Sequence, residues 1–214
     1  MTSSDGHRGH RSSTGNNNSH LFIINVMSLP PKLDILVTFA TKFDIEALSE
    51  TWLEQSYTDD DLNILHYTSY LTLYREDGNR HGGGATLHVI NKLGTKRHGP
   101  RLVDGPLELI CVDVLSGKKS CQVGCVYRRL NEAISWYDRF QSVLDVYCER
   151  RYQSMIILGD FNCDFLKSRD SDRLRVLMSM YGMTQSIDKP TRISGTTITT
   201  KTTSCRWYNV GCTV

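Results

Sequence analysis

Three short apolar segments of the chain each lead to a polar residue whose side chain can bind a cation or activate a water molecule. LFIIN ends in Asn25, and IEALS precedes Glu50. SMIILG precedes Asp160, and Asn162 lies two positions after Asp160. Side chains at the end of a buried strand are accessible to a substrate while their backbone stays rigid. Carboxylate and amide oxygens suit Mg²⁺, which takes one or two protein carboxylates and fills its shell with water and substrate phosphate. The three strand ends therefore predict chemistry on a phosphate ester.

Each of these residues also has a structural interpretation when it is considered alone. An acidic residue after a strand more often forms a turn or caps a helix than takes part in catalysis. Tyr127, which ends the apolar run SCQVGCVY, is equally explained as an amphipathic residue at a strand end. The functional interpretation therefore depends on the order of the segments and on the residues around them.

The first part of the chain predicts a β-α-β unit that would position Asn25 and Glu50. The β-branched run LFIINV predicts a buried strand, and Pro30 and Pro31 then supply a turn and a helix start. KLDILVTFATKF carries apolar residues at helical spacing, and DIEALSE returns to a strand-like pattern. A strand, a helix and a second strand within about thirty residues favour an α/β fold over an all-β fold.

The middle of the chain predicts short strands that pair in antiparallel fashion. YTSYLTLYRED and GGGATLHVI flank a glycine-rich turn, and LELICVDVL and SCQVGCVYRR flank a turn at residues 116–119. The stretch KLGTKRHGPR between these pairs is interpreted as a solvated, charged loop in preference to a phosphate-binding segment.

The last part predicts two helices around the strand SMIILGDFN, which carries Asp160. DRLRVLMSMYGM should be a helix with Gly182 near its C-cap. NEAISWYDRFQSVLDVYCERR should be an amphipathic helix, with an apolar stripe formed by Ile134, Tyr137, Phe140, Leu144 and Tyr147.

Composition limits how these segments can fold and where the protein works. The 214 residues are 39% hydrophobic and 22% charged, which fits one domain with a substantial core. The formal net charge is only +2, so any phosphate-binding surface must be local. Seven cysteines without a CxxC pair are typical of a reduced, intracellular protein. The sequence shows no secretory signal and no apolar stretch of about 18 residues, so we expect a protein of the nucleus or cytoplasm that contacts no membrane.

The motifs, taken together, resemble one protein family. ETWL at 50–53, the glycine triplet at 82–84 and GDFNCDFL at 159–166 are specific as a set, although each alone is weak. With KPTR at 189–192 they resemble the endonuclease domain of non-LTR (LINE-type) retrotransposons, a branch of the endonuclease/exonuclease/phosphatase superfamily that includes apurinic-site endonucleases and deoxyribonuclease I. The resemblance covers residues 21–192 and implies an α/β fold, a four-layered αββα sandwich of two mixed β-sheets.

The resemblance also implies a role for each strand-end residue. Glu50 would be the principal metal ligand, and Asn25 would help position the metal, Mg²⁺ or Mn²⁺, or the phosphate. Asp160 would orient or deprotonate the attacking water, and Asn162 would hold that water and the phosphate by hydrogen bonds. Tyr127 would donate a hydrogen bond to a phosphate oxygen, where negative charge develops in the transition state.

Other implied features concern substrate contacts and partners. Thr191 in KPTR matches a family position near the cleft, and Arg80 precedes the glycine triplet, whose loop lies near DNA in relatives. Arg128 and Arg129 stand where the family often has Arg-Pro-Pro after the tyrosine, which leaves their role open. The implied partners are DNA and a reverse transcriptase encoded by the same element, although the chain itself carries no reverse transcriptase motif.

The two ends of the chain depart from the pattern. Residues 1–20, rich in Ser, Gly, Asn and His, predict a disordered polar leader. Residues 193–214 form an atypical Thr-rich tail where the family has a Ser-x-Ile-Asp segment and then a Ser-Asp-His that contacts the scissile phosphate. The last acidic residue is Asp188 and the last histidine is His98. We therefore expect a sandwich that is incomplete at its carboxyl end, with an exposed sheet edge.

Two functions remain open on this evidence. The first is a Mg²⁺-dependent endonuclease that nicks DNA by hydrolysis and leaves a 3′-hydroxyl. The second is a catalytically inactive remnant that keeps part of the fold and binds nucleic acid without cutting it. A phosphatase acting on lipids or nucleotides is less favoured, because ETWL, GDFNCD and KPTR together most resemble the retroelement branch.

Overall fold

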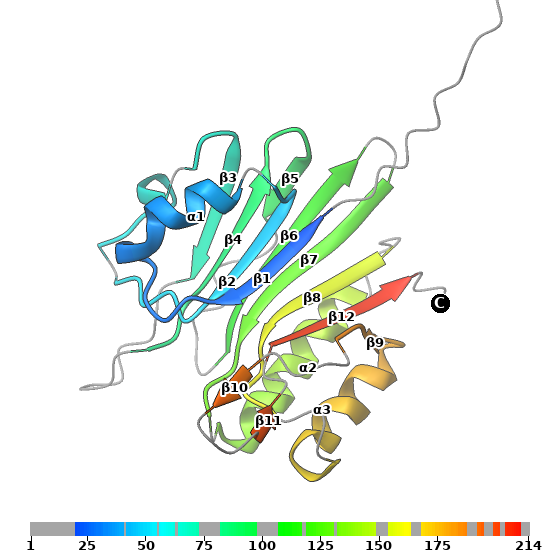
Figure 1. Cartoon of the computed structure of the whole chain (residues 1–214). Coiled ribbons are helices and arrows are strands. Elements are labelled where there is room, and N and C mark those ends of the chain that lie inside the picture. The colour runs from blue at the N-terminus through cyan, green and yellow to red at the C-terminus, as the bar shows by residue number, and fades with distance from the viewer. Residues whose placement is uncertain are drawn as a thin grey trace, which may run out of the picture.

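The chain forms two mixed β-sheets, a short separate hairpin, and helices (Figure 1). The computed structural model describes residues 20–40, 42–54, 56–62, 64–72, 82–97, 107–116, 119–130, 132–148, 154–163, 168–187, 192–194, 199–201 and 204–210. None of the helices in these ranges is long and apolar enough to cross a membrane.

The first sheet grows from the predicted β-α-β unit and has the strand order β1-β2-β4-β3. β1 and β2 are parallel, and β4 and β3 extend the sheet in antiparallel fashion. Its elements are β1 (Leu21–Asn25), the 3₁₀ helix η1 (Pro30–Lys32), α1 (Leu33–Ala40), β2 (Ile45–Ser49), the 3₁₀ helix η2 (Asp59–Leu62), β3 (Tyr67–Thr72) and β4 (Ala85–Ile90).

The second sheet has the order β5-β6-β7-β8-β12-β9. β6 and β7 form the predicted hairpin, and β8 joins β7 in parallel after α2 has crossed between them. Its elements are β5 (Gly94–Arg97), β6 (Glu108–Ser116), β7 (Lys119–Tyr127), α2 (Ile134–Cys148), β8 (Ser154–Asp160), α3 (Ser168–Met180), β9 (Thr184–Gln185) and β12 (Ser204–Val210), while β10 (Arg192–Ser194) and β11 (Thr199–Lys201) pair separately.

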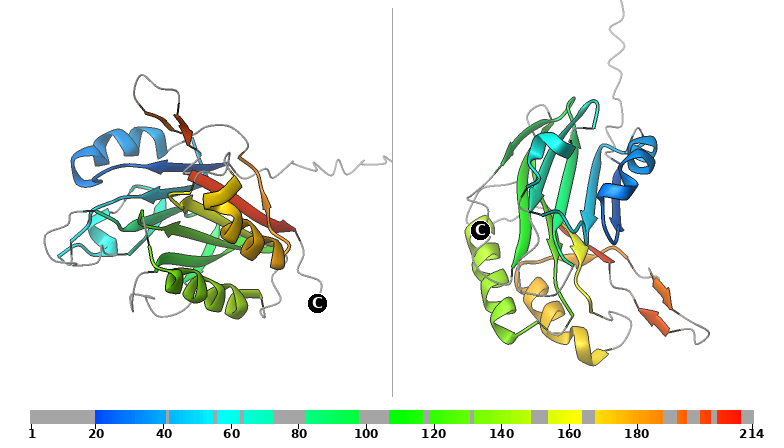
Figure 2. Two further views of the ribbon diagram at one scale, coloured as in Figure 1. Left: turned by 90° about the horizontal axis from the view of Figure 1, so that it is seen from below. Right: turned by 90° about the vertical axis from the view of Figure 1, so that its left-hand side faces the viewer.

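The two sheets lie face to face, with α1 on one outer side and α2 and α3 on the other (Figure 2). Apolar side chains such as Leu87 and Val123 fill the space between the sheets. Phe140 belongs to the cluster that packs α2 and α3 onto the second sheet, and Leu36 and Leu48 belong to the cluster on the outer face of the first. The predicted four-layered αββα sandwich is confirmed.

The carboxyl-terminal tail corrects one expectation. Ser204–Val210 forms β12, which pairs with all seven residues of β8 and with β9 on its other side. β8 is therefore an inner strand, and the tail, in which no strand was predicted, contributes one to the second sheet, while β1 remains an end strand of the first sheet. The run SCRWYNV carries aromatic and β-branched residues, which favour a strand.

Two smaller expectations also need correction. The charged stretch interpreted as a loop contains β5, which pairs with β6 from Gly94 to Arg97. In α2 the predicted stripe is right except at its first residue, because Ile134 is 66% exposed. Trp136, which the stripe omitted, is fully buried instead and packs 4.9 Å from the Phe140 ring, centroid to centroid.

The outer face of the first sheet contains a buried pair of ionisable residues. Glu46 on β2 lies directly opposite His88 on β4, and both are at most 1% exposed. Ser69 donates its one hydroxyl hydrogen to the Leu62 carbonyl (2.9 Å) and lies 2.8 Å from His88 Nδ1. His88 Nδ1–H must therefore be the donor to Ser69, which leaves Nε2 without a hydrogen in the neutral ring. Neither Nε2 nor the Glu46 carboxylate has a hydrogen-bond partner among the described residues.

This pair predicts two opposite dependences of stability on pH. Burial raises the pKa of Glu46 from 4.5 to about 7, so its contribution is full below pH 4.5 and is lost as the pH rises through 7. Burial lowers the pKa of His88 from 6.5 to about 4, so its contribution is full above pH 6.5 and is lost as the pH falls through 4. In the wild-type chain the two effects largely cancel between pH 4 and 8.

In each single variant, the unfolding free energy should show the pH dependence that the remaining member of the pair causes. In urea titrations, Glu46→Gln should gain about 2 to 3 kcal/mol of unfolding free energy between pH 4 and 7, and His88→Gln should lose a similar amount. The exposed residue Glu54 provides the control, since Glu54→Gln should keep the wild-type profile. Parallel pH profiles for the two buried variants would contradict this assignment.

Candidate active site at the strand ends

Strand register places the predicted residues at one end of the sandwich. β7 and β8 are parallel and their last paired residues are Tyr127 and Asp160. β1 and β2 are also parallel and end in the pair Asn25 and Ser49, directly before Glu50. Two hydrogen bonds then join the sheets: Asn25 Nδ2 donates to Asp160 Oδ2 (2.9 Å), and the Tyr127 hydroxyl donates to Glu50 Oε1. The sheets thus bring both carboxylates to the same site.

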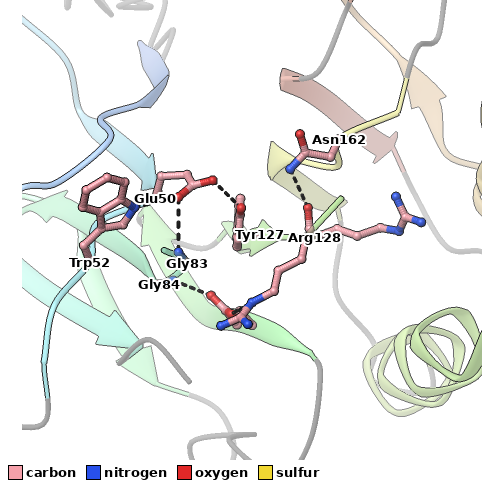
Figure 3. A network of polar contacts seen from close by, with 9 residues as sticks. Glu50, Trp52, Gly83, Gly84, Tyr127, Arg128 and Asn162 are labelled. Carbon is pink, nitrogen blue, oxygen red and sulfur yellow. Dashed lines mark hydrogen bonds and ion pairs between the residues drawn. The ribbon is translucent and has the colours of Figure 1, made fainter. Parts of the chain in front are cut away.

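The Glu50 carboxylate is held by three donors (Figure 3). Tyr127 binds Oε1, while Oε2 accepts hydrogen bonds from Trp52 Nε1 (2.7 Å) and the Gly83 N–H (3.2 Å). Each carboxylate oxygen has two lone pairs, so Oε1 keeps one of them after binding Tyr127. Glu50 is therefore fixed in orientation and still able to coordinate a cation.

The Asp160 carboxylate is fixed at both oxygens. Besides the bond from Asn25 to Oδ2, Oδ1 accepts the backbone N–H of Asn162 at 2.9 Å. Asn162 in turn donates its side-chain amide to the Arg128 carbonyl at 2.7 Å, as Figure 3 shows. Asp160 is 1% exposed, so its contacts are shielded from competing water. A carboxylate held in this way can accept a proton along one defined direction.

Tyr127 lies between the two carboxylates and is a hydrogen-bond donor. It is 6% exposed, and burial raises the pKa of its hydroxyl far above the ordinary value. The hydrogen bond to Glu50 and the negative charges of Glu50, Asp160 and Glu108 raise this pKa further. The hydroxyl therefore keeps its hydrogen at every physiological pH.

The structure adds Glu108, which sequence reasoning missed, to the surroundings of the site. Glu108 pairs with Tyr127 in the β6–β7 hairpin, accepts the Gly84 N–H, and forms an ion pair with Arg129 (Nε to Oε1, 3.2 Å). A Cβ on Gly83 would lie only 2.7 Å from the Glu108 oxygens, and Gly83 has φ +94°. The glycine triplet is thus needed for close packing of a loop that donates to Glu50. The available signal was an acidic residue at the start of a mostly apolar strand.

Unusual backbone conformations are concentrated around the same residues. Met27, Ser28, Glu50, Trp52 and Asn162 all have positive φ, between 45° and 79°. Residues other than glycine take such angles at a cost of about 1–3 kcal/mol each, and only where the surrounding structure holds them. Because strain of this kind is found most often at functional sites, it is a reason to consider these strand ends as a candidate site.

The donor set fits Mg²⁺ better than a softer metal. Glu50 Oε1, the Asp160 carboxylate and Asn25 Oδ1 are hard oxygen atoms, as Mg²⁺ prefers. The described residues contain no group of three or more His, Cys, Asp or Glu arranged to hold a metal. One or two carboxylates are enough for Mg²⁺, because water and substrate phosphate complete its shell.

Five of the seven predicted site residues are brought together here: Asn25, Glu50, Tyr127, Asp160 and Asn162. The other two, Arg80 and Thr191, lie outside the described residues. Arg128 and Arg129, whose role was open, both turn back into the protein, since Arg129 pairs with Glu108 and Arg128 is buried.

Comparisons with known proteins show what this architecture is similar to. No family model and no curated protein matches the sequence. Among solved structures, the 3′ phosphatase NExo from Neisseria is 14% identical (TM-score 0.63), with coverage of 89% of this chain and 86% of that one. The endonuclease domain of the telomere-specific non-LTR retrotransposon TRAS1 is 14% identical (TM-score 0.65), with coverage of 88% of this chain and 83% of that one.

A third structure carries the superfamily name. An endonuclease/exonuclease/phosphatase family protein from Leptotrichia buccalis is 11% identical (TM-score 0.65), with coverage of 90% of this chain and 88% of that one. At these identities the likeness concerns the fold. The two mixed sheets with helices outside therefore have the fold that these three structures share.

Proposed function

We propose that this chain is a metal-dependent phosphodiesterase that nicks DNA by hydrolysis and leaves a 3′-hydroxyl, and that it derives from a non-LTR retrotransposon. One observation carries the proposal: hydrogen bonds between the two sheets bring both carboxylates to one site. Asn25 donates to Asp160, and Tyr127 donates to Glu50. DNA is the proposed substrate because the NExo structure is bound to a product DNA hairpin. The proposed cofactor is Mg²⁺ or Mn²⁺, and a reverse transcriptase of the same element is the proposed partner.

The chain's own residues supply the positioning steps of such a hydrolysis. Asp160, held by Asn25 and Asn162, accepts a proton from the attacking water. Tyr127 exchanges its bond to Glu50 for a bond to a phosphate oxygen, where its hydrogen stabilises the charge that develops. Glu50 would hold the metal together with Asn25, which lies beside Asp160. The metal would supply Lewis-acid stabilisation of the phosphate when bound.

An inactive, DNA-binding remnant is the second candidate, and the composition of β12 favours it. The strand that completes the second sheet, SCRWYNV, contains no acidic residue and no histidine. β12 therefore does not supply the late aspartate and histidine of the resembled family. We place the protein inside the cell in either case, in agreement with the free thiol of Cys125.

Plasmid nicking distinguishes the two candidates. Purified protein should convert supercoiled plasmid to the relaxed circle in Mg²⁺ or Mn²⁺. This conversion should stop when EDTA is added. An Asp160→Asn preparation, purified in parallel, controls for contaminating nucleases. Folded protein that shifts DNA in a gel but leaves the plasmid supercoiled in both metals would instead support the inactive remnant.

A further inference from the structure

Arg128 is a buried arginine directly after Tyr127, and its environment is unusual for a charged side chain. It is 8% exposed, and its Cζ lies 5.5 Å from the centre of the Trp136 ring and 5.2 Å from that of Tyr137. Its Nε has no hydrogen-bond partner among the described residues. Burying a guanidinium costs several kcal/mol, and stacking on aromatic rings offsets only part of that cost. A residue held at such a cost is a candidate for a functional role.

The polar contacts of Arg128 all go to one short segment. Its backbone N–H donates to the Asp160 carbonyl (2.9 Å), and its own carbonyl accepts the Asn162 side-chain amide (2.7 Å). Its Nη1 donates to the Phe161 carbonyl (3.1 Å) and contacts the Cys163 sulfur (3.5 Å). Arg128 thus contacts every residue from Asp160 to Cys163.

This segment needs such support because it leaves the sheet. β8 ends at Asp160, and Asn162 takes a left-handed conformation with φ 48°. The planar guanidinium is fixed between the α2 rings and the Phe161 carbonyl, so it connects the segment to a helix of the core. The side chains that depend on this segment are the Asp160 carboxylate and the Asn162 amide.

We propose that Arg128 is a positioning residue, which fixes Asp160 and Asn162 for catalysis by tying residues 160–163 to α2. The catalytic part of this inference rests on the proposed nuclease function, whereas the structural part does not. Loss of an outer-shell contact of this kind typically lowers activity by about 10- to 100-fold.

Arg128→Met is the informative variant, because methionine keeps a long apolar stem against the rings and removes the guanidinium donors. Arg173 offers a matched control: its Cζ lies 4.8 Å from the same Tyr137 ring, and it forms an ion pair with Asp138 on the protein surface. With a nicked-product assay, kcat of Arg128→Met should fall about 10- to 100-fold while KM for DNA changes less than about 2-fold. Arg173→Met should keep both constants, and Arg128→Lys, with one donor restored, should recover part of kcat.

An NMR measurement tests the positioning without reference to activity. The Asn162 side-chain and backbone amide signals should shift in Arg128→Met and stay in place in Arg173→Met. In the wild-type chain, the Arg128 guanidinium hydrogens should be resolved and exchange slowly with water, which needs no variant to fold. Guanidinium hydrogens that exchange as fast as those of Arg173, or Asn162 signals unmoved in a folded Arg128→Met, would overturn the inference. A wild-type chain that shows the NMR signature but never nicks DNA would reject the proposed function alone.

Discussion

Replacing Asp160 with asparagine should lower the rate of plasmid nicking by about 10²- to 10⁴-fold, the usual contribution of a positioned general base. Two effects act in the same direction. The neutral amide cannot take a proton from water. Its NH₂ group must also face a donor, because Asn25 Nδ2 binds one oxygen of Asp160 and the Asn162 N–H binds the other. The substitution therefore removes the charge and disturbs the contact between the two sheets.

A second buried aspartate of the same sheet provides the control. Asp113 on β6 is 7% exposed and lies 3.5 Å from Gln122 Nε2, away from the strand ends. Asp113→Asn should change the nicking rate less than about 2-fold, since a substitution at a position without a reacting group nearby seldom alters catalysis. Rates are compared by gel quantification at equal concentrations of folded protein. Equal losses in the two variants would mean that a buried charge supports the fold and not the chemistry.

The positions of five residues could be predicted because each lies at the end of a recognisable strand or within two residues after it: Asn25, Glu50, Tyr127, Asp160 and Asn162. Parallel pairing of β1 with β2 and of β7 with β8 then carries those ends to common edges. Such an argument requires only the pattern of apolar runs and the direction of the strands. It predicts proximity, and it leaves the chemical role of each residue to experiment.

Residues that act through tertiary contacts could not be found in the same way. Arg128 and Arg129 are adjacent and chemically identical in the sequence, yet one stacks on the α2 rings and the other pairs with Glu108. Which of the two arginines makes which contact depends on the side of the β7 strand end toward which each side chain points. Glu108 likewise depends on the approach of the glycine triplet, which belongs to the other sheet.

The tail strand β12 shows a different limit of sequence reasoning. Its pattern is that of a strand, but these residues have no counterpart in the resembled family, and no strand was predicted from them. The strand depends on an available partner, and β8 provides one along its whole length. Pairing with an exposed strand edge satisfies backbone groups whatever the side chains are, so the tail adds a strand to the second sheet without the expected motif.

The substitution Gly159→Ala should be the most destabilising single change at the site, with a loss of about 4 kcal/mol or more of unfolding free energy. Gly159 has φ +154° and lies opposite Val126 in the parallel β7–β8 pair. A Cβ there would overlap the Val126 carbonyl oxygen and lie 2.8 Å from its carbonyl carbon. Both are backbone atoms, so no side-chain rotation relieves the clash, and the strands must separate.

That separation would act directly on the site, because Tyr127 follows Val126 and Asp160 follows Gly159 in the same register. Urea unfolding of Gly159→Ala is compared with Gly94→Ala on β5, where a Cβ meets only the Leu115 side chain, at 3.3 Å, and φ is ordinary. Gly94→Ala should stay within about 1 kcal/mol of wild type. If Gly159→Ala unfolds at the same urea concentration as Gly94→Ala, the two backbones do not approach as closely as described. The spacing of Tyr127 and Asp160 would then have to be set by the Asn25 and Glu50 hydrogen bonds alone.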